Sequence, residues 1–159
     1  PTRAGRSSRP LLVARPQASA ALATDRIMIL PDAVSITYLP DARWVDELPA
    51  VLQSLLIRSI SETGRIAYVG RSDAGPIPDK ALLVRIDAFE VNALGNGTFD
   101  VTVDLDLTMI NDSTQRVIAS RRFSKTAQVG SDQVTEIVGA FQTVLNELLP
   151  ACRFYKSDA

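Results

Sequence analysis

The sequence predicts an α+β domain of two layers, in which a mixed, mostly antiparallel sheet carries two amphipathic helices packed on one face. Residues 81–127 alternate apolar and polar side chains over three successive stretches, which is typical of a three-stranded meander. Two other segments, beginning at Leu48 and Val134, repeat apolar residues every three or four positions, as helices do. A one-sided sheet and two one-sided helices bury each other best in two layers.

The composition excludes several classes of function. The 159 residues suffice for one buried core, and the net charge of −1 gives no field that would attract nucleic acid. The chain contains no histidine, which removes the commonest general base and transition-metal ligand. We therefore expect no nucleic-acid partner and no cofactor. No apolar run approaches the roughly 20 residues that cross a bilayer, and the first residues lack the apolar core of a signal peptide.

Three parts are predicted along the chain. Residues 1–9 contain arginines, glycine and serines without periodicity, so we expect a flexible tether that is dispensable for folding. Residues 10–150 form the single α+β domain, and residues 151–159 form a tail. The sequence around Cys152, Leu-Leu-Pro-Ala-Cys, resembles a lipoprotein cleavage box, but it follows a helical pattern near the C-terminus, so we expect an unmodified thiol.

Three short strands are predicted before the first helix, at residues 10–16, 25–31 and 34–40. The third alternates Val34, Ile36 and Tyr38 on one face. Pro31 and Pro40 lack a backbone donor, so they belong at strand ends or edges.

The first helix is predicted to begin near Leu48, with Asp46 as its N-cap, Pro49 in its first turn and Gly64 as its stop. We further expect Val45 to meet the first helical turn. Its apolar face consists of Leu48, Val51, Leu52, Leu55, Leu56 and Ile60. Residues 65–71 then predict a short strand, which is followed by a turn-rich loop.

The meander follows. Its first strand moves its apolar positions from even to odd numbers, which predicts a bulge near Asp87 or Ala88. The second strand alternates without exception, and turn-forming sequences separate the three strands. The apolar face of the second strand consists of Phe99, Val101, Val103, Leu105, Leu107 and Met109.

The second helix begins near Val134, with Ser131 or Asp132 as its cap, and ends at Pro150. Gly139 lies inside it and costs about 1 kcal/mol relative to alanine unless close approach to a neighbour repays that cost.

The residue types argue against catalysis and metal binding. Asp100, Asp104 and Asp106 share one strand face, but same-face neighbours lie about 7 Å apart, too far for a compact cation cage. If Met109 opposes Val117, Asp104 lies opposite Arg122 and forms an exposed ion pair with it. The serines have no histidine to activate them, so we expect a protein that is not an enzyme.

Trp44 is the only tryptophan, and it precedes the first helix. One interpretation makes it a structural anchor that covers the open end of the core. The other makes it an exposed contact for a partner or a lipid tail, because tryptophan is enriched at binding hot spots. Tyr38 and Leu39 are candidates for the same contact.

Residues 24–71 resemble the ABC-type transport auxiliary lipoproteins. The resemblance extends over roughly residues 11–150, through Asp-Ala-Phe-Glu-Val at residues 87–91 and through residues 109–123. The residues that carry it in the tryptophan segment are Tyr38, Leu39, Ala42, Trp44, Asp46, Leu48 and Pro49.

This resemblance implies a non-enzymatic periplasmic accessory component of a Gram-negative envelope. Its implied partners are an MCE-domain protein and an ABC permease and ATPase that move lipids or hydrophobic compounds between the membranes. It also implies attachment to the outer membrane through a lipid anchor upstream of Pro1, and it leaves room for contact with lipid and for a homo-oligomer. The alternative is an envelope assembly or pilot-like lipoprotein of another secretion or insertion system.

Overall fold

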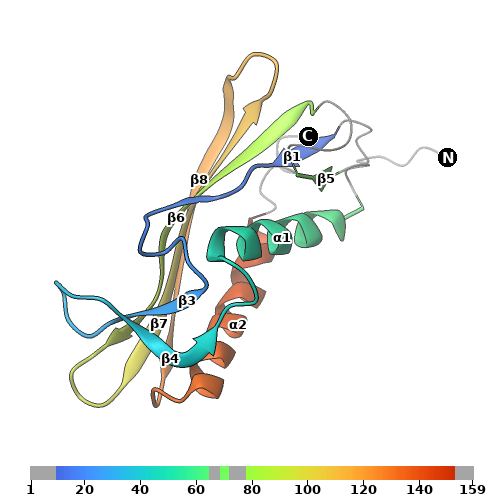
Figure 1. The fold of residues 1–159 in the computed structure, drawn as a ribbon. Helices are drawn as coiled ribbons and strands as arrows, with labels where there is room; N and C mark the ends of the chain where they lie inside the picture. Colours follow the sequence, from blue (N-terminus) through green and yellow to red (C-terminus); the bar gives the residue numbers. More distant parts are fainter. Residues whose placement is uncertain (1–9, 65–68, 72–77, 153–159) are drawn as a thin grey trace.

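The computed structural model describes residues 10–64, 69–71 and 78–152, so the predicted tether and residues 153–159 lie outside the described part. Two helices and an eight-stranded mixed sheet make up this part (Figure 1). These elements confirm the mixed sheet and the two helices of the predicted class. Their bounds are β1 (Leu11–Val13), β2 (Gln17–Ala18), β3 (Arg26–Leu30), β4 (Thr37–Arg43), α1 (Leu48–Ser61), β5 (Val69–Gly70), β6 (Lys80–Ala93), β7 (Phe99–Asn111), β8 (Val117–Val129) and α2 (Val134–Ala151).

The long strand β6 organises the sheet. Along one side it pairs antiparallel with β7, which pairs antiparallel with β8. Along its other side, β1, β2 and β3 follow one another as parallel partners. The outermost strands on that side are β5, which is parallel to β1, and β4, which is antiparallel to β3. The meander is therefore antiparallel, and most of the remaining pairings are parallel.

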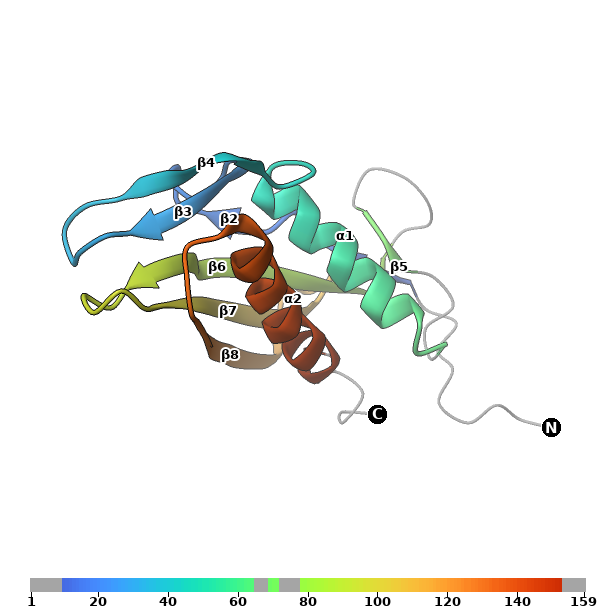
Figure 2. The ribbon, with the colours of Figure 1, turned by 90° about the horizontal axis from the view of Figure 1, so that it is seen from below.

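Both helices lie on the same side of the sheet in Figure 1, and Figure 2 shows the strands β3 and β4 curling over the side of α2. Alternation along β6 and β7 sends one set of apolar side chains toward the helices, and the buried face of α2 meets them. The layers are therefore a curled sheet and a helix pair. The helix side chains buried against the sheet include Leu48, Leu52, Leu56, Ile60, Ile137, Phe141, Val144 and Leu148.

The bulge predicted in the first meander strand is confirmed, because the pairing of β6 with β7 shifts register between Ile86 and Ala88. The predicted strands at residues 10–16 and 25–31 correspond to β1 and β3, and the sequence did not indicate the two-residue strand β2.

The third predicted strand was placed too early. Val34 and Ile36 are exposed, by 94% and 47%, and lie in the turn before β4. The Asp32 carboxylate accepts hydrogen bonds from the backbone N–H groups of Val34 and Ser35, so this segment forms a turn instead of a ladder. The strand then runs through Pro40, which is tolerated because β4 is an edge strand.

The predicted cap of α1 is wrong. Glu47 is the N-cap residue and makes no side-chain cap, while the Asp46 carboxylate accepts a hydrogen bond of 2.7 Å from the Glu47 N–H. The helix does not need a cap from Asp46, because the Leu48 N–H bonds to the Thr24 carbonyl and Pro49 has no N–H. Val45 is 96% exposed, so the expected contact with the first turn is also wrong.

The predicted ends of α2 need the same correction. Its N-cap residue is Gln133, without a side-chain cap, although the Ser131 hydroxyl accepts a hydrogen bond from the Gln133 N–H and bonds to Glu136. Pro150 lies inside the last turn and the helix continues to Ala151. A proline there removes a single hydrogen bond close to the point where the helix ends.

Gly139 is exposed on α2, and a Cβ atom built on it would meet nothing within 4 Å. No close approach therefore repays the cost of glycine in the helix. We expect Gly139→Ala to raise the free energy of unfolding by about 0.5 to 1 kcal/mol, measured by urea denaturation. A lower stability in this variant would contradict the helical geometry assigned to this position.

Candidate functional site

Trp44 lies at the joint between β4 and α1, against two phenylalanines. Its ring meets the rings of Phe89 on β6 and Phe141 on α2 edge-on, at centroid distances of 5.4 and 5.3 Å. The two phenylalanines stack on each other at 4.8 Å. The Trp44 backbone N–H also donates a hydrogen bond of 2.7 Å to the Asp25 carbonyl, which fixes the joint. These contacts are those of a structural anchor, with a ring that remains half-buried.

Tyr38 and Leu39 occupy different environments. The Tyr38 hydroxyl donates a hydrogen bond of 2.9 Å to the Ala21 carbonyl, and the Arg26 guanidinium lies 5.7 Å from the ring centroid. Tyr38 is half-buried, whereas Leu39 is only 5% exposed and belongs to the core. A role for these side chains in contacting a partner or a lipid stays a prediction.

The joint exposes Val45, an apolar residue for which the sequence predicts packing against the helix. Directly before Trp44, residues of β3 and β4 line an open groove of about 510 Å³: Arg26, Pro40, Asp41, Ala42 and Arg43. Asp41 has a φ of 60°, a left-handed conformation, and it lies where the pairing of β3 with β4 shifts register. The joint thus exposes a valine next to a groove of mixed charge.

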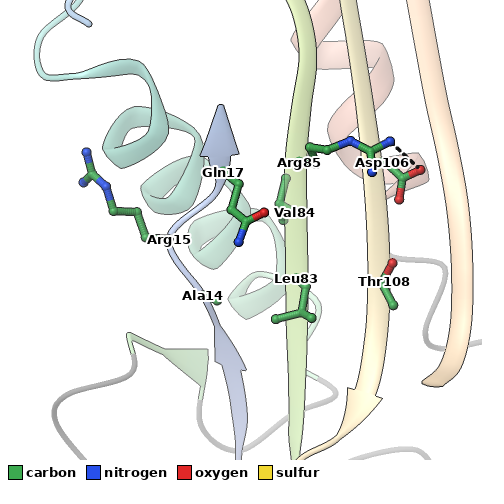
Figure 3. A pocket seen from close by; sticks show the side chains of 8 residues that line it. All are labelled: Ala14, Arg15, Gln17, Leu83, Val84, Arg85, Asp106 and Thr108. Atoms are coloured by element: carbon green, nitrogen blue, oxygen red, sulfur yellow. Dashed lines mark hydrogen bonds and ion pairs between the residues drawn. The ribbon is translucent and has the colours of Figure 1, made fainter. Parts of the chain in front are cut away.

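A second groove, of about 200 Å³, lies where β1 gives way to β2 beside β6 and β7 (Figure 3). The Arg85 side chain points toward Asp106, and Arg15 points away from the groove to pair with Glu47 at 2.8 Å. Both arginines that line this groove therefore form ion pairs with carboxylates of the protein itself. Its lining consists of Ala14, Arg15, Gln17, Leu83, Val84, Arg85, Asp106 and Thr108.

The aspartates of β7 bind neighbouring side chains. Met109 pairs with Ala119, so Asp106 lies opposite Arg122, and the register expected from the sequence was wrong by two residues. Arg122 nevertheless reaches Asp104 diagonally, at 2.6 Å. Asp106 accepts a hydrogen bond from Arg85 at 3.3 Å, and Asp100 accepts one from Asn92 at 2.7 Å. Among the described residues, no group of three carboxylate, histidine or cysteine side chains could hold a metal ion.

Charge and burial on this face shift the pKa values of three side chains, Asp87, Glu90 and Arg122. The hydrogen bond from Arg85 lowers the pKa of Asp87, and the hydrogen bond to Asp104 raises the pKa of Arg122. Burial raises the pKa of Glu90, and the nearby charge of Asp104 raises it further. The ion pairs Arg85–Asp106 and Arg122–Asp104 connect neighbouring strands on the outer face of the sheet.

Asp104→Asn tests whether this face has more than a structural role. We expect the free energy of unfolding to change by no more than about 1 kcal/mol, because the ion pair is largely exposed on the Arg122 side. For the parent and for the variant, adding Mg²⁺ or Ca²⁺ should leave the melting temperature unchanged. Tight cation binding that the substitution abolishes would reverse this assignment.

Cys152 is fully buried at the end of α2, and burial raises the pKa of its thiol to about 12. The thiol is therefore protonated at neutral pH and packs as part of the core.

These features define a small mixed α/β domain whose tryptophan anchors a strand-to-helix joint. The family model of the ABC-type transport auxiliary lipoprotein component matches residues 1–151, so the chain belongs to this family. No curated protein matches the chain significantly. No helix of the described residues is long and apolar enough to cross a membrane.

Several solved structures share the fold. Protein XCC0632 from Xanthomonas campestris is 27% identical, with a TM-score of 0.83 over 96% of this chain and 87% of that one. The hypothetical protein CT253 from Chlamydia trachomatis is 8% identical, with a TM-score of 0.61 over 96% of this chain and 100% of that one. PelC from Paraburkholderia phytofirmans, a dodecamer, is 14% identical, with a TM-score of 0.56 over 91% and 82%. The last two likenesses concern the fold alone.

Proposed function

We propose that this protein is the periplasmic accessory component of an ABC transport system that contains an MCE-domain protein and moves lipids or hydrophobic compounds across the envelope. The observation that carries the proposal is the family match over residues 1–151. The family description names an auxiliary component of ABC-type transport and a lipoprotein. The MCE-domain partner, the permease and the ATPase are the finer part of the proposal.

The role assigned to the chain is binding and positioning, with ATP hydrolysis done by the transporter. Two features support this non-enzymatic role. The single tryptophan is engaged in packing with Phe89 and Phe141, and on the outer sheet face Arg85 pairs with Asp106 and Arg122 pairs with Asp104. In the full-length protein, a lipid anchor upstream of Pro1 would hold the domain at the outer membrane, on its periplasmic side.

Capture of the lipidated full-length protein from its own envelope tests the function. After mild detergent extraction and affinity purification, mass spectrometry should find the MCE-domain protein, the permease and the ATPase enriched together. Enrichment of the components of a different secretion or insertion machinery would replace the proposal with the pilot-like alternative.

We place the partner contact at the β4–α1 joint, where Val45 is exposed beside the groove on β4. Val45→Asp should leave the melting temperature within about 2 °C of the parent, because the side chain packs on nothing. Binding of the purified MCE-domain partner, measured by biolayer interferometry, should weaken about tenfold or more, since a charge replaces an apolar contact. Val34→Asp is the matched control, because Val34 is equally exposed in a different turn. Equal binding by both variants would remove the joint from the interface.

We also propose that this protein assembles into a homo-oligomer. The dodecamer is a property of PelC and supports only the capacity of this fold to assemble. Sedimentation equilibrium over a range of protein concentrations would determine the state of this chain.

A further inference from the structure

The strands β4 and β8 lie at opposite borders of the sheet, and they differ in regularity. β4 contains Pro40, which has no N–H to donate, and Asp41 in a left-handed conformation with a φ of 60°. Its pairing with β3 also shifts register. Proline, bulges and short length are the devices that keep an edge strand from pairing with another chain. The border at β4 is therefore protected.

β8 shows none of these devices. Its 13 residues include no proline and no glycine. Its pairing with β7 continues without a shift from Val129, opposite Phe99, to Ala119, opposite Met109. Within the part of the chain that the structure describes, β7 is the one strand that pairs with β8. Figure 2 shows β8 at the outer border of the meander, with α2 over one face of the sheet.

This border offers backbone hydrogen bonds. In an antiparallel pair, every second residue turns its N–H and C=O groups away from the partner strand, so about half of the residues of β8 direct them outward. Most side chains of β8 are exposed as well, on both faces of the sheet. A long, regular and exposed edge of this kind is a template for one more strand.

The charge of β8 selects among possible strands. The strand contains Arg121, Arg122 and Lys125 and no acidic residue, and all three basic residues are exposed. The Arg122 side chain is 64% exposed, whereas that of its partner Asp104 is only 14% exposed. Lys125 remains 46% exposed beside Glu147 of α2. The exposed charge that β8 itself carries at this border is therefore positive.

A second copy of β8 fits this edge poorly, because like charges on adjacent strands destabilise their pairing. Carboxylates on the added strand have the opposite effect. Residues directly opposite each other on neighbouring strands have Cβ atoms about 4.5 to 5.5 Å apart, within reach of an ion pair. Arg121 and Arg122 are consecutive and so point to opposite faces of the sheet. Carboxylates on both faces of an added strand would find a basic partner.

We infer that the free edge of β8 binds an extended segment of a partner protein that carries carboxylate side chains, and that this segment adds to the sheet as a further strand. Main-chain hydrogen bonds then provide the affinity, and the basic side chains of β8 provide the preference for an acidic segment. This surface lies on the border opposite the β4–α1 joint, so it is separate from the partner contact proposed there.

Three synthetic peptides test this assignment. The first has nine residues with capped ends, threonine and valine at both ends and four glutamates in the middle. The second has lysine in place of each glutamate, and the third keeps the glutamates but has proline at its centre. We expect the glutamate peptide to bind the chain at least tenfold more tightly than the lysine peptide, as measured by fluorescence anisotropy at low salt. The proline peptide should also bind at least tenfold more weakly, because proline interrupts the ladder.

Amide hydrogen exchange, followed by NMR, locates the contact. Saturation with the glutamate peptide should slow exchange at alternate residues of β8 at least tenfold and leave β4 unchanged. Protection of β8 that rises with protein concentration in the absence of peptide would mean that a second copy occupies the edge, and the inference would be wrong.

Matched variants test the role of charge. Arg121→Gln together with Lys125→Gln should weaken binding of the glutamate peptide several-fold, since two cross-strand ion pairs are lost. Arg43→Gln together with Arg58→Gln removes the same charge from exposed positions elsewhere and should change binding less than twofold. Both double variants should melt like the parent, because the four side chains are exposed.

Several results would overturn the inference. They are the absence of glutamate-peptide binding at millimolar concentration, equal binding of the glutamate and lysine peptides, and equal binding of the proline peptide. Equal losses in the two double variants would also overturn it. None of these results depends on which transport or assembly machinery the full-length protein captures, so the proposed function is tested separately.

Discussion

Trp44→Ala is expected to lower the free energy of unfolding by about 3 kcal/mol, as measured by equilibrium denaturation. The substitution removes both edge-on contacts, with Phe89 and with Phe141, and leaves a cavity where β4, β6 and α2 meet. Aromatic pairs of this geometry contribute beyond the area they bury. We expect a value at the lower end of the range for buried tryptophans, because the ring is half-buried.

Val45→Ala is the control for this measurement. Val45 is the next residue and is 96% exposed, so its truncation should change stability by no more than about 0.5 kcal/mol. If Trp44→Ala also stayed within that margin, the ring would not anchor the core and the docking interpretation of Trp44 would replace it.

Phe141→Ala is expected to lower the free energy of unfolding by about 3 to 5 kcal/mol. Phe141 is 1% exposed and contacts the rings of Trp44 and Phe89. Val138→Ala, one helical turn earlier and 39% exposed, should cost much less. The double variant of Trp44 and Phe141 should lose less than the two single losses combined, since each single change already removes their shared contact. Strict additivity would mean that the two rings do not support each other.

The elements with strong periodicity could be predicted from the sequence. Strand β7 alternates over its whole length and α2 keeps its apolar spacing through several turns, so local pattern and tertiary burial agree there. The bulge in β6 was predictable for the same reason, because its apolar positions change parity.

The edge of the sheet next to β6 could not be predicted in the same way. The strands β1, β2 and β3 each pair with a different part of the long strand β6. A two-residue strand such as β2 is too short to show a periodic pattern in the sequence. The start of β4 depended on a turn made by the Asp32 side chain, which competed with an apparent alternation of Val34 and Ile36.

At the β4–α1 joint, the sequence predicted the role of Trp44 but not its partners or the exposure of Val45. The position of Trp44 before a helix indicated an anchor, but its partners Phe89 and Phe141 lie far away in sequence and meet it through the tertiary fold. The exposure of Val45 carried no sequence signal, since an apolar residue before a helix usually packs on its first turn. The register of β8 was missed because Gln115, with a φ of 59°, and a shift between Met109 and Ile110 lengthen the turn before it.

Photocrosslinking from Val45 tests whether the β4–α1 joint contacts the transport system. A photoreactive amino acid at this exposed position, in the lipidated protein within its own cells, would capture whatever touches the β4–α1 joint. The same group at Val34 serves as the reference. We expect mass spectrometry of the Val45 product to find peptides of the MCE-domain protein or of the permease, and we expect the Val34 product to lack them. If the Val45 products contained only components of another assembly machinery, the proposed role in ABC transport would be wrong.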